Sequence, residues 1–281
     1  MSVWFFFWRR CSPSRRSTAG RFALDHHPAQ SMTNHGFFFA TCGLAALTVG
    51  CRPTAESRPP VVEVRYAATP VVVDGRLDDS VWGGAPTYAL GGMVDGGRRT
   101  RLQEGGSARF AWDDKYFYVA LESTDSDVVT ESDANGLDQF RLGDVGEAFL
   151  KPEGSPWDWE LHVTPRGNQT SYFFPSSGRR LPGCKLSVHR LTVGARIDGT
   201  LNDAWDRDRG WTAEMAIPRA MLTEHGNRFG PGSRWRLLVG RYNFSITLDN
   251  TELSSMPEIS QVNFHLTREY ATLRFTPTDP P

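Results

Sequence analysis

The chain alternates between apolar and polar residues over many short stretches. In the segment 159–164 every second residue is Trp, Leu or Val, and polar residues stand between them. A period of two is typical of a half-buried β-strand. The turn residues Pro, Arg, Gly and Asn follow at 165–168, and the segment 169–174 then returns as a partner strand. This part of the chain therefore predicts a β-hairpin.

Similar patterns predict further short strands along most of the chain. They lie at residues 61–67, 71–73, 108–112, 116–122, 186–197, 211–217, 235–239 and 271–275. Helical signals are few: a turn at 80–82 and a short helix at 218–225, which Pro218 begins. Residues 244–265 look irregular. Many short strands with turn signals between them predict an all-β fold, a β-sandwich of two mostly antiparallel sheets with one or two short helices.

The first fifty residues do not share this pattern. An apolar run at 37–49 is too short to span a bilayer, and it ends in small residues before Cys51. This arrangement resembles a bacterial lipoprotein signal, which implies a lipid on Cys51. We therefore expect residues 1–51 to be an upstream segment and signal peptide, with translation starting at Met1 or Met32. Residues 52–60 would be a linker, 61–276 one domain and 277–281 a tail.

If the signal segment is removed on export, the net charge and the cysteine content must be counted on the mature chain. Residues 1–50 hold five arginines and one acid, so the remainder has a net charge of about −5. An acidic domain argues against nucleic acid as a partner and leaves a lipid anchor as the contact with a membrane. Cys184 would be the one other cysteine of the mature chain, so no disulfide framework is expected. The predicted location is the bacterial cell envelope, as a lipoprotein, or the exterior, as a secreted protein.

Acids and tryptophans gather around the predicted hairpin. Asp144 and Glu147 precede it, and Trp157 and Trp159 begin it. Flat aromatic rings beside carboxylates suit a sugar, because the rings take C–H surface and the acids accept hydroxyl hydrogen bonds. The alternative is that the tryptophans are core residues and the acids are solvated; for Trp159 the strand alternation favours this alternative.

Six segments, taken in order, resemble carbohydrate-binding module family 9 and its wider family-9-like domains. They are VVVDGRLDDSVW, ARFAWDDKYFYVALESTDSD, GDVGEAFLKP with WELHVTPRGN, GWTAEMAIPRAML, GSRWRLLVGRYN and VNFHLTREYATLRF, which together span about 61–276. The resemblance implies a sandwich that binds sugars, often holds structural calcium and often accompanies glycoside hydrolases.

From this resemblance we expect a non-catalytic domain that binds a polysaccharide or an oligosaccharide end in carbohydrate catabolism, with a glycoside hydrolase as a possible partner. Candidate sugar-binding residues are Trp112, Trp157, Trp159, Glu160, Trp205, Arg241 and Asn243. Calcium prefers carboxylate oxygens on irregular backbone, so the candidate ligands are Asp125, Asp127, Asp144 and Glu147. A plain solvated loop explains the first two equally well.

Two other classes of function remain as alternatives. Glycoside hydrolysis needs two carboxylates across a cleft, which Asp144 with Glu147, or Glu147 with Glu160, would supply. A haem-binding redox module would need an axial pair such as Met93 with His162 or His265, although a lone Met is usually core packing. Motifs for serine nucleophiles, paired zinc histidines and phosphate loops are absent from the sequence.

Overall fold

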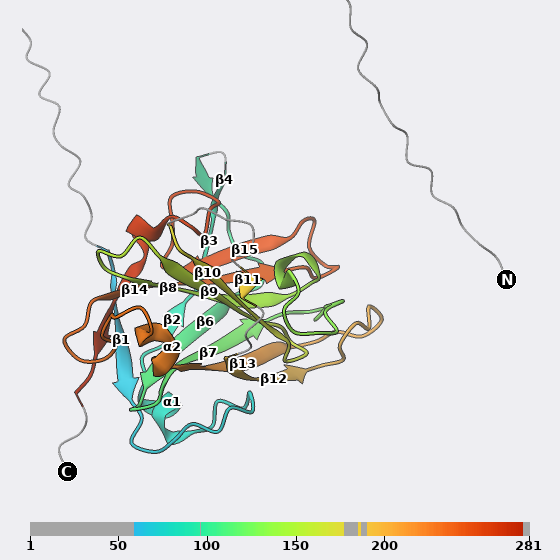
Figure 1. Ribbon diagram of the computed structural model, residues 1–281. Coiled ribbons are helices and arrows are strands. Elements are labelled where there is room, and N and C mark those ends of the chain that lie inside the picture. Colours follow the sequence, from blue (N-terminus) through green and yellow to red (C-terminus); the bar gives the residue numbers. More distant parts are fainter. Residues whose placement is uncertain (1–58, 96, 177–184, 187–189, 278–281) are drawn as a thin grey trace, which may run out of the picture. The chain divides into compact units, whose positions relative to one another are not determined.

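The computed structural model describes residues 59–95, 97–176, 185–186 and 190–277 (Figure 1). These residues belong to one compact unit, Ala55–Pro281. The predicted signal segment, Cys51 and Cys184 lie outside the described residues. Within the described part, no helix is long and apolar enough to cross a membrane.

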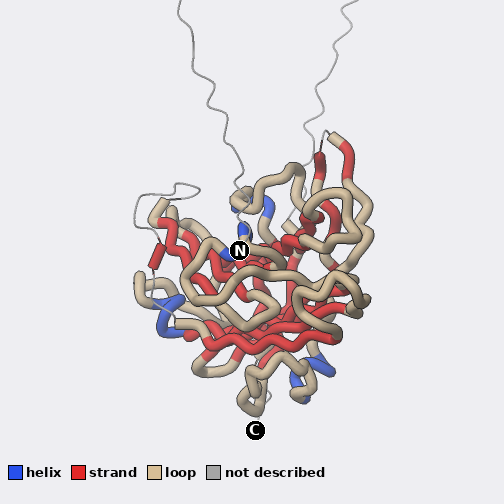
Figure 2. The backbone as a smooth tube through the Cα atoms, turned by 90° about the vertical axis from the view of Figure 1, so that its right-hand side faces the viewer, coloured by secondary structure: helices blue, strands red, loops and turns tan. Residues whose placement is uncertain are grey.

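Strands dominate, and helices are limited to single turns. The strands are β1 Val61–Tyr66, β2 Tyr88–Ala89, β3 Gly91–Gly92, β4 Val94–Asp95, β5 Arg98–Arg99, β6 Gly106–Trp112, β7 Tyr116–Thr124, β8 Val145–Pro152, β9 Asp158–Val163, β10 Gln169–Phe174, β11 Lys185–Leu186, β12 Thr192–Asp198, β13 Gly210–Pro218, β14 Trp235–Asn243, β15 Glu252–Met256 and β16 Ala271–Phe275. The helices are α1 Ser80–Gly84 and α2 Arg219–Thr223, with 3₁₀ turns η1 Gln139–Arg141 and η2 Thr267–Glu269. In Figure 2 the strands form the interior layers, and loops wrap around them.

The strands form two layers that share β1. One layer, here called sheet A, has the order β11-β10-β9-β8-β14-β16-β1, and β15 also pairs with β14. The other, sheet B, has the order β1-β6-β7-β13-β12. The first half of β1 pairs in parallel with β16 and its last two residues pair in parallel with β6, so β1 passes from one layer to the other. Most other pairings are antiparallel, and the predicted β-sandwich is confirmed.

Alternation along the strands places the main core between the sheets. On β9, Trp159, Leu161 and Val163 point inward and are buried, as the period of two predicts. On β13, inward residues such as Trp211 and Met215 meet them from the other layer. The hairpin prediction is confirmed, since β9 and β10 pair in register from Val163–Gln169 to Asp158–Phe174.

A second, smaller core covers the outer face of sheet B. The segment after β1 folds back so that Val81 and Trp82 of α1 pack on Ala120 and Ala216. Glu214 of β13 fixes this segment, because its carboxylate accepts hydrogen bonds from the Trp82 indole N–H and from the backbone N–H groups of residues 74 and 75. Trp82 is therefore a core residue.

A third core lies on the outer face of sheet A. Phe149 of β8 and Leu238 of β14 pack there against Ile259, Phe264 and Tyr270 from the segment that follows β15. We predicted residues 244–265 to be irregular, but β15 lies within them. Its sequence, Glu-Leu-Ser-Ser-Met, has little strand signal, and its pairing with β14 decides the conformation.

Candidate functional site

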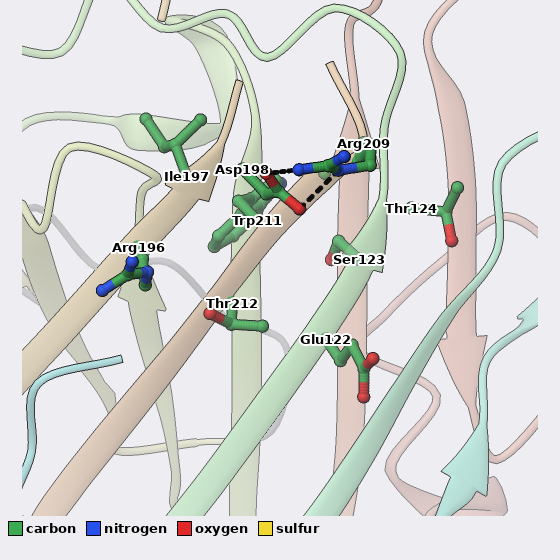
Figure 3. Close-up of a pocket in the computed structure, with 10 residues that line it drawn as sticks. Glu122, Ser123, Thr124, Arg196, Ile197, Asp198, Arg209, Trp211 and Thr212 are labelled. Carbon is green, nitrogen blue, oxygen red and sulfur yellow. Dashed lines mark hydrogen bonds and ion pairs between the residues drawn. The ribbon is translucent and has the colours of Figure 1, made fainter. Parts of the chain in front are cut away.

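Two hollows on opposite layers of the sandwich are candidates for a binding site. The larger, about 380 Å³, lies over β7, β12 and β13 and is drawn in Figure 3. Its most prominent feature is the Asp198–Arg209 ion pair, with two N–H···O contacts of 2.7 Å between well exposed side chains. Trp211 lies at its edge, but the indole is buried and packs in the main core. This hollow therefore offers no ring face on which a sugar could stack.

The smaller hollow, about 170 Å³, lies on the outer face of sheet A. Aromatic rings form its walls: Phe140 from η1, Tyr242 from β14 and Phe264 from the loop after β15. The rings contact one another, with Phe140 and Phe264 centred 6.0 and 5.6 Å from Tyr242. Asn263 at its rim is exposed. We call this hollow the sheet A pocket.

Charged side chains form the floor of the sheet A pocket. Glu147 of β8 lies opposite His162 of β9, and Glu160 projects from the same face of β9. His162 Nε2 lies 3.0 Å from an oxygen of Glu147 and 2.8 Å from an oxygen of Glu160. His265 approaches from the rim, 3.5 Å from the other Glu160 oxygen. Glu147, Glu160 and His162 are buried, whereas His265 is half-buried.

Burial and the acids of this face shift the pKa values of two neighbouring groups. Burial raises the pKa of Tyr270 well above its ordinary value, and the charges of Asp158, Glu160 and Glu147 raise it further. Burial also raises the pKa of Asp158 to about 6; Lys151 opposes this shift and Glu160 adds to it. Perturbed groups beside a hollow are typical of functional sites.

The predicted tryptophans do not gather in one groove. Trp112, Trp157 and Trp159 are 3%, 8% and 1% exposed and belong to the main core. Trp157 packs edge-on against Trp235, and Arg219 lies over the ring of Trp112. None of the three presents a face to solvent, and this burial argues against the sugar-binding role that we predicted for them. Their strands point these side chains inward.

Trp205 is the exception, because it is 97% exposed. It lies in the loop between β12 and β13, where its backbone N–H bonds to Asp203. Asn202 ties the loop to Thr130 by two hydrogen bonds. The ring is thus a free surface on an anchored loop, away from the residues that line the sheet A pocket.

Arg241 and Asn243 are not surface hydroxyl binders. Both point inward from β14 and are 2% and 1% exposed. Arg241 donates to Asp125 at 3.1 Å, and Asn243 donates to Glu104 at 2.7 Å. They satisfy buried acids at one end of the core, which argues against their predicted role in sugar binding. Among the predicted hydroxyl binders, only Glu160 lies in the sheet A pocket.

The four predicted calcium ligands do not form one site. Asp144 and Glu147 are three residues apart at the start of β8, so they point to opposite faces of sheet A. Asp144 uses its two oxygens to accept the backbone N–H groups of Val129 and Phe244. The Arg241 guanidinium takes the place of a cation beside Asp125.

Among the described residues, one group alone brings three His, Cys, Asp or Glu ligand atoms within 4.8 Å of one another, and it contains none of the three aspartates. Asp127 is buried beside Asp125, and one of its oxygens lacks a hydrogen bond. The described side chains alone therefore do not complete the predicted calcium site, and calcium binding by these acids stays a prediction.

Several residues of the sheet A pocket were missed. Phe140 and Tyr242 follow no apolar periodicity that would mark them as ligand contacts, and Asn263, Phe264 and His265 lie in a segment that looked irregular. Met93, suggested as a haem ligand, is buried in the third core with Phe149 and Phe264. A pocket of about 170 Å³ is also too small for a haem.

Comparison with known proteins agrees with the fold. Residues 73–156 match the model of the family described as "Carbohydrate family 9 binding domain-like". No curated protein matches. A solved structure from Bacteroides uniformis ATCC 8492, described as a candidate carbohydrate-binding protein, has a TM-score of 0.63 and 15% identity, covering 78% of this chain and all of its own.

Two further structures are of a family 9 carbohydrate-binding module from Caldicellulosiruptor kristjanssonii. The complex with cellotriose has a TM-score of 0.53 and 14% identity, covering 78% of this chain and 100% of that one. The complex with glucose has a TM-score of 0.54 and 14% identity, covering 79% and 98%. At these identities the likeness concerns the fold. The chain thus carries a carbohydrate family 9 binding domain-like sequence at residues 73–156 and has the fold of family 9 carbohydrate-binding modules.

Proposed function

We propose that the protein binds carbohydrate without catalysis and that the sheet A pocket receives the sugar. The observation that carries the proposal is the meeting of three aromatic rings with buried carboxylates in one small hollow. Ring faces pack on the C–H surface of a sugar, and carboxylates accept its hydroxyl hydrogen bonds. The family match over residues 73–156 and the sugar-bound structures of the same fold support this proposal.

The size of the pocket limits what enters it. About 170 Å³ holds a single sugar residue rather than a length of polysaccharide. We therefore propose that the ligand is an oligosaccharide or polysaccharide whose terminal residue enters the pocket. Because hydroxyl groups exchange water for protein with small net gain, the affinity should lie between about micromolar and millimolar.

Calorimetry with glucose, cellobiose, cellotriose and xylotriose tests the proposal. Phe140→Ala and Asn263→Ala change partly exposed residues of the pocket, so the fold should survive. Each should weaken binding by about 1–3 kcal/mol, or roughly 5- to 150-fold. Asn250→Ala, an exposed asparagine outside the pocket, is the matched control. Equal affinities for all three variants would place the sugar elsewhere.

A glycoside hydrolase is the second candidate. The nearest carboxylate oxygens of Glu147 and Glu160 lie within 4.8 Å of each other, close to the spacing of about 5 Å in retaining glycosidases. Turnover of a panel of aryl glycosides, abolished by Glu160→Gln, would establish it. Absence of turnover alongside sugar binding would leave the binding function.

The cellular setting rests on sequence alone. The apolar run at 37–49 before Cys51 supports export with a lipid on this cysteine, in the cell envelope of a bacterium. Such a domain would act in carbohydrate catabolism, beside a glycoside hydrolase. Mass spectrometry of the mature N-terminus is the direct test, and an unmodified Cys51 or retained upstream residues would contradict it.

A further inference from the structure

At the floor of the sheet A pocket, three side chains that could bind a metal ion converge on one point. Adjacent strands place Glu147 directly opposite His162, and Glu160 lies two residues before His162 on the same face. One atom, His162 Nε2, faces an oxygen of each carboxylate, at 3.0 and 2.8 Å. These three ligand atoms all lie within 4.8 Å of one another, and the side chains are buried.

The convergence of these three atoms suits a metal site. Two carboxylate oxygens and one imidazole nitrogen lie within 4.8 Å of one another, which is the spread that ligands of one ion have. A divalent cation at this place would bind both oxygens and the nitrogen lone pair. Imidazole with carboxylates suits Zn²⁺, Mn²⁺ or Fe²⁺, whereas Ca²⁺ prefers oxygen ligands throughout.

A second histidine faces the same group from the opposite side. His265 Nε2 lies 3.5 Å from the other oxygen of Glu160, and the loop after β15 supplies it. Aromatic edges hold both imidazoles in place: Phe140 lies perpendicular to His162, and Phe149 lies nearly perpendicular to His265. These ring contacts restrict the orientation of both imidazoles beside Glu160.

We propose that Glu147, Glu160 and His162 bind a divalent transition-metal ion, with His265 as a fourth ligand. The ion would lie at the floor of the pocket, so its remaining coordination position faces the hollow. There it would bind a hydroxyl oxygen of a sugar. This last step rests on the proposed function, whereas metal binding itself does not.

The test uses the full chain, stripped of metal and titrated with Zn²⁺ by calorimetry and with Co²⁺ by visible absorption. We expect one equivalent of either ion, and a cobalt spectrum of nitrogen and oxygen ligation. Glu160→Gln and His162→Gln should each weaken binding at least 100-fold. His225→Gln and Glu122→Gln, which change a histidine and an acid outside the pocket, should bind as the wild type does.

Folding is checked by near-ultraviolet circular dichroism of each variant, and His265→Gln serves if His162→Gln fails to fold. It should weaken binding about 10-fold or more. Absence of Zn²⁺ and Co²⁺ binding, or undiminished binding by Glu160→Gln, would overturn the proposal. Sugar titrations with and without metal separate the two ideas. If the protein binds sugar but no metal, only the proposed metal site is contradicted. If it binds metal but no sugar, only the proposed function is contradicted.

Discussion

The buried acids at one end of the core should make stability depend on pH, and Asp144→Asn tests this. Burial and the neighbouring charge of Asp125 raise the pKa of Asp144 to about 8. Burial raises the pKa of Asp125 to about 6, while Arg241 opposes that rise. An acid whose pKa is higher when folded holds more protons in the folded state. The contribution of these two acids to stability is therefore greatest below about pH 4, falls as pH rises towards 8, and is level above it.

The size of the slope follows from proton linkage. One proton difference changes the free energy of unfolding by about 1.4 kcal/mol per pH unit. For a domain of this size that is roughly 3–5 °C in melting temperature per pH unit, as an upper limit. In Asp144→Asn most of this slope between pH 6 and 8 should vanish. The side-chain amide of this variant has one oxygen acceptor for the backbone N–H groups of Val129 and Phe244. Its free energy of unfolding should therefore also carry a loss of about 1–3 kcal/mol that does not depend on pH.

Thermal unfolding in EDTA at pH 5 to 9 measures the slope, with Asp133→Asn, an exposed acid of the same loop region, as control. Equal slopes in wild type and Asp144→Asn would refute the reasoning. A second series of melts, with calcium in place of EDTA, tests whether these acids bind calcium. Because Arg241 accompanies these acids, millimolar calcium should leave the melting temperature unchanged. A calcium-dependent rise that Asp144→Asn abolishes would show that the aspartates hold the ion after all.

Three further substitutions separate core from surface. Glu214→Gln should lower the free energy of unfolding, measured in urea, by about 1–3 kcal/mol, because the Glu214 carboxylate accepts hydrogen bonds from the Trp82 indole and from two backbone N–H groups. An unchanged midpoint of urea unfolding would mean that the packing of Trp82 alone holds the segment that contains α1. Trp157→Ala should cost about 3–5 kcal/mol, since the ring is buried among aromatic side chains. Trp205→Ala should change stability by less than about 0.5 kcal/mol, because its ring contacts solvent. If Trp205 contacts a sugar chain, this variant weakens the binding of long oligosaccharides and leaves the affinity for glucose unchanged. An equal loss of affinity for oligosaccharides and glucose would contradict a contact of Trp205 with the sugar chain outside the sheet A pocket.

The sequence predicted the layers of the fold well because alternation is a local property. Each strand of the hairpin lies where its period of two places it, and Trp159 is inward for the same reason. The same rule applied to β14 places Arg241 and Asn243 on the inward face with Trp235, Leu237 and Val239. We instead assigned these two polar residues to sugar binding, which requires an accessible side chain. Their buried partners, Asp125 and Glu104, come from distant segments, and only the folded chain shows them.

The pocket itself could be predicted only in part. Outward positions Glu160 and His162 follow from the alternation of β9, but an outward position on a sandwich is ordinarily solvated. What buries them is the loop after β15, whose Phe264 and His265 fold over sheet A. The sequence of residues 257–266 does not predict this, because contacts with strands outside the loop, β8 and β14, fix its conformation.

The two outer faces of the sandwich then differ in a way that bears on function. Sheet B is covered by α1 and its flanking segment, where Glu214 is matched by donors and small alanines allow close packing. Sheet A is covered by aromatic rings that meet partly over apolar residues, Phe149 and Leu238, and partly over the carboxylates of the sheet A pocket. Carboxylates at the floor of a hollow give this face hydrogen-bond acceptors for a polar ligand. An apolar covering such as that of sheet B cannot supply them, so the proposed binding function falls on sheet A.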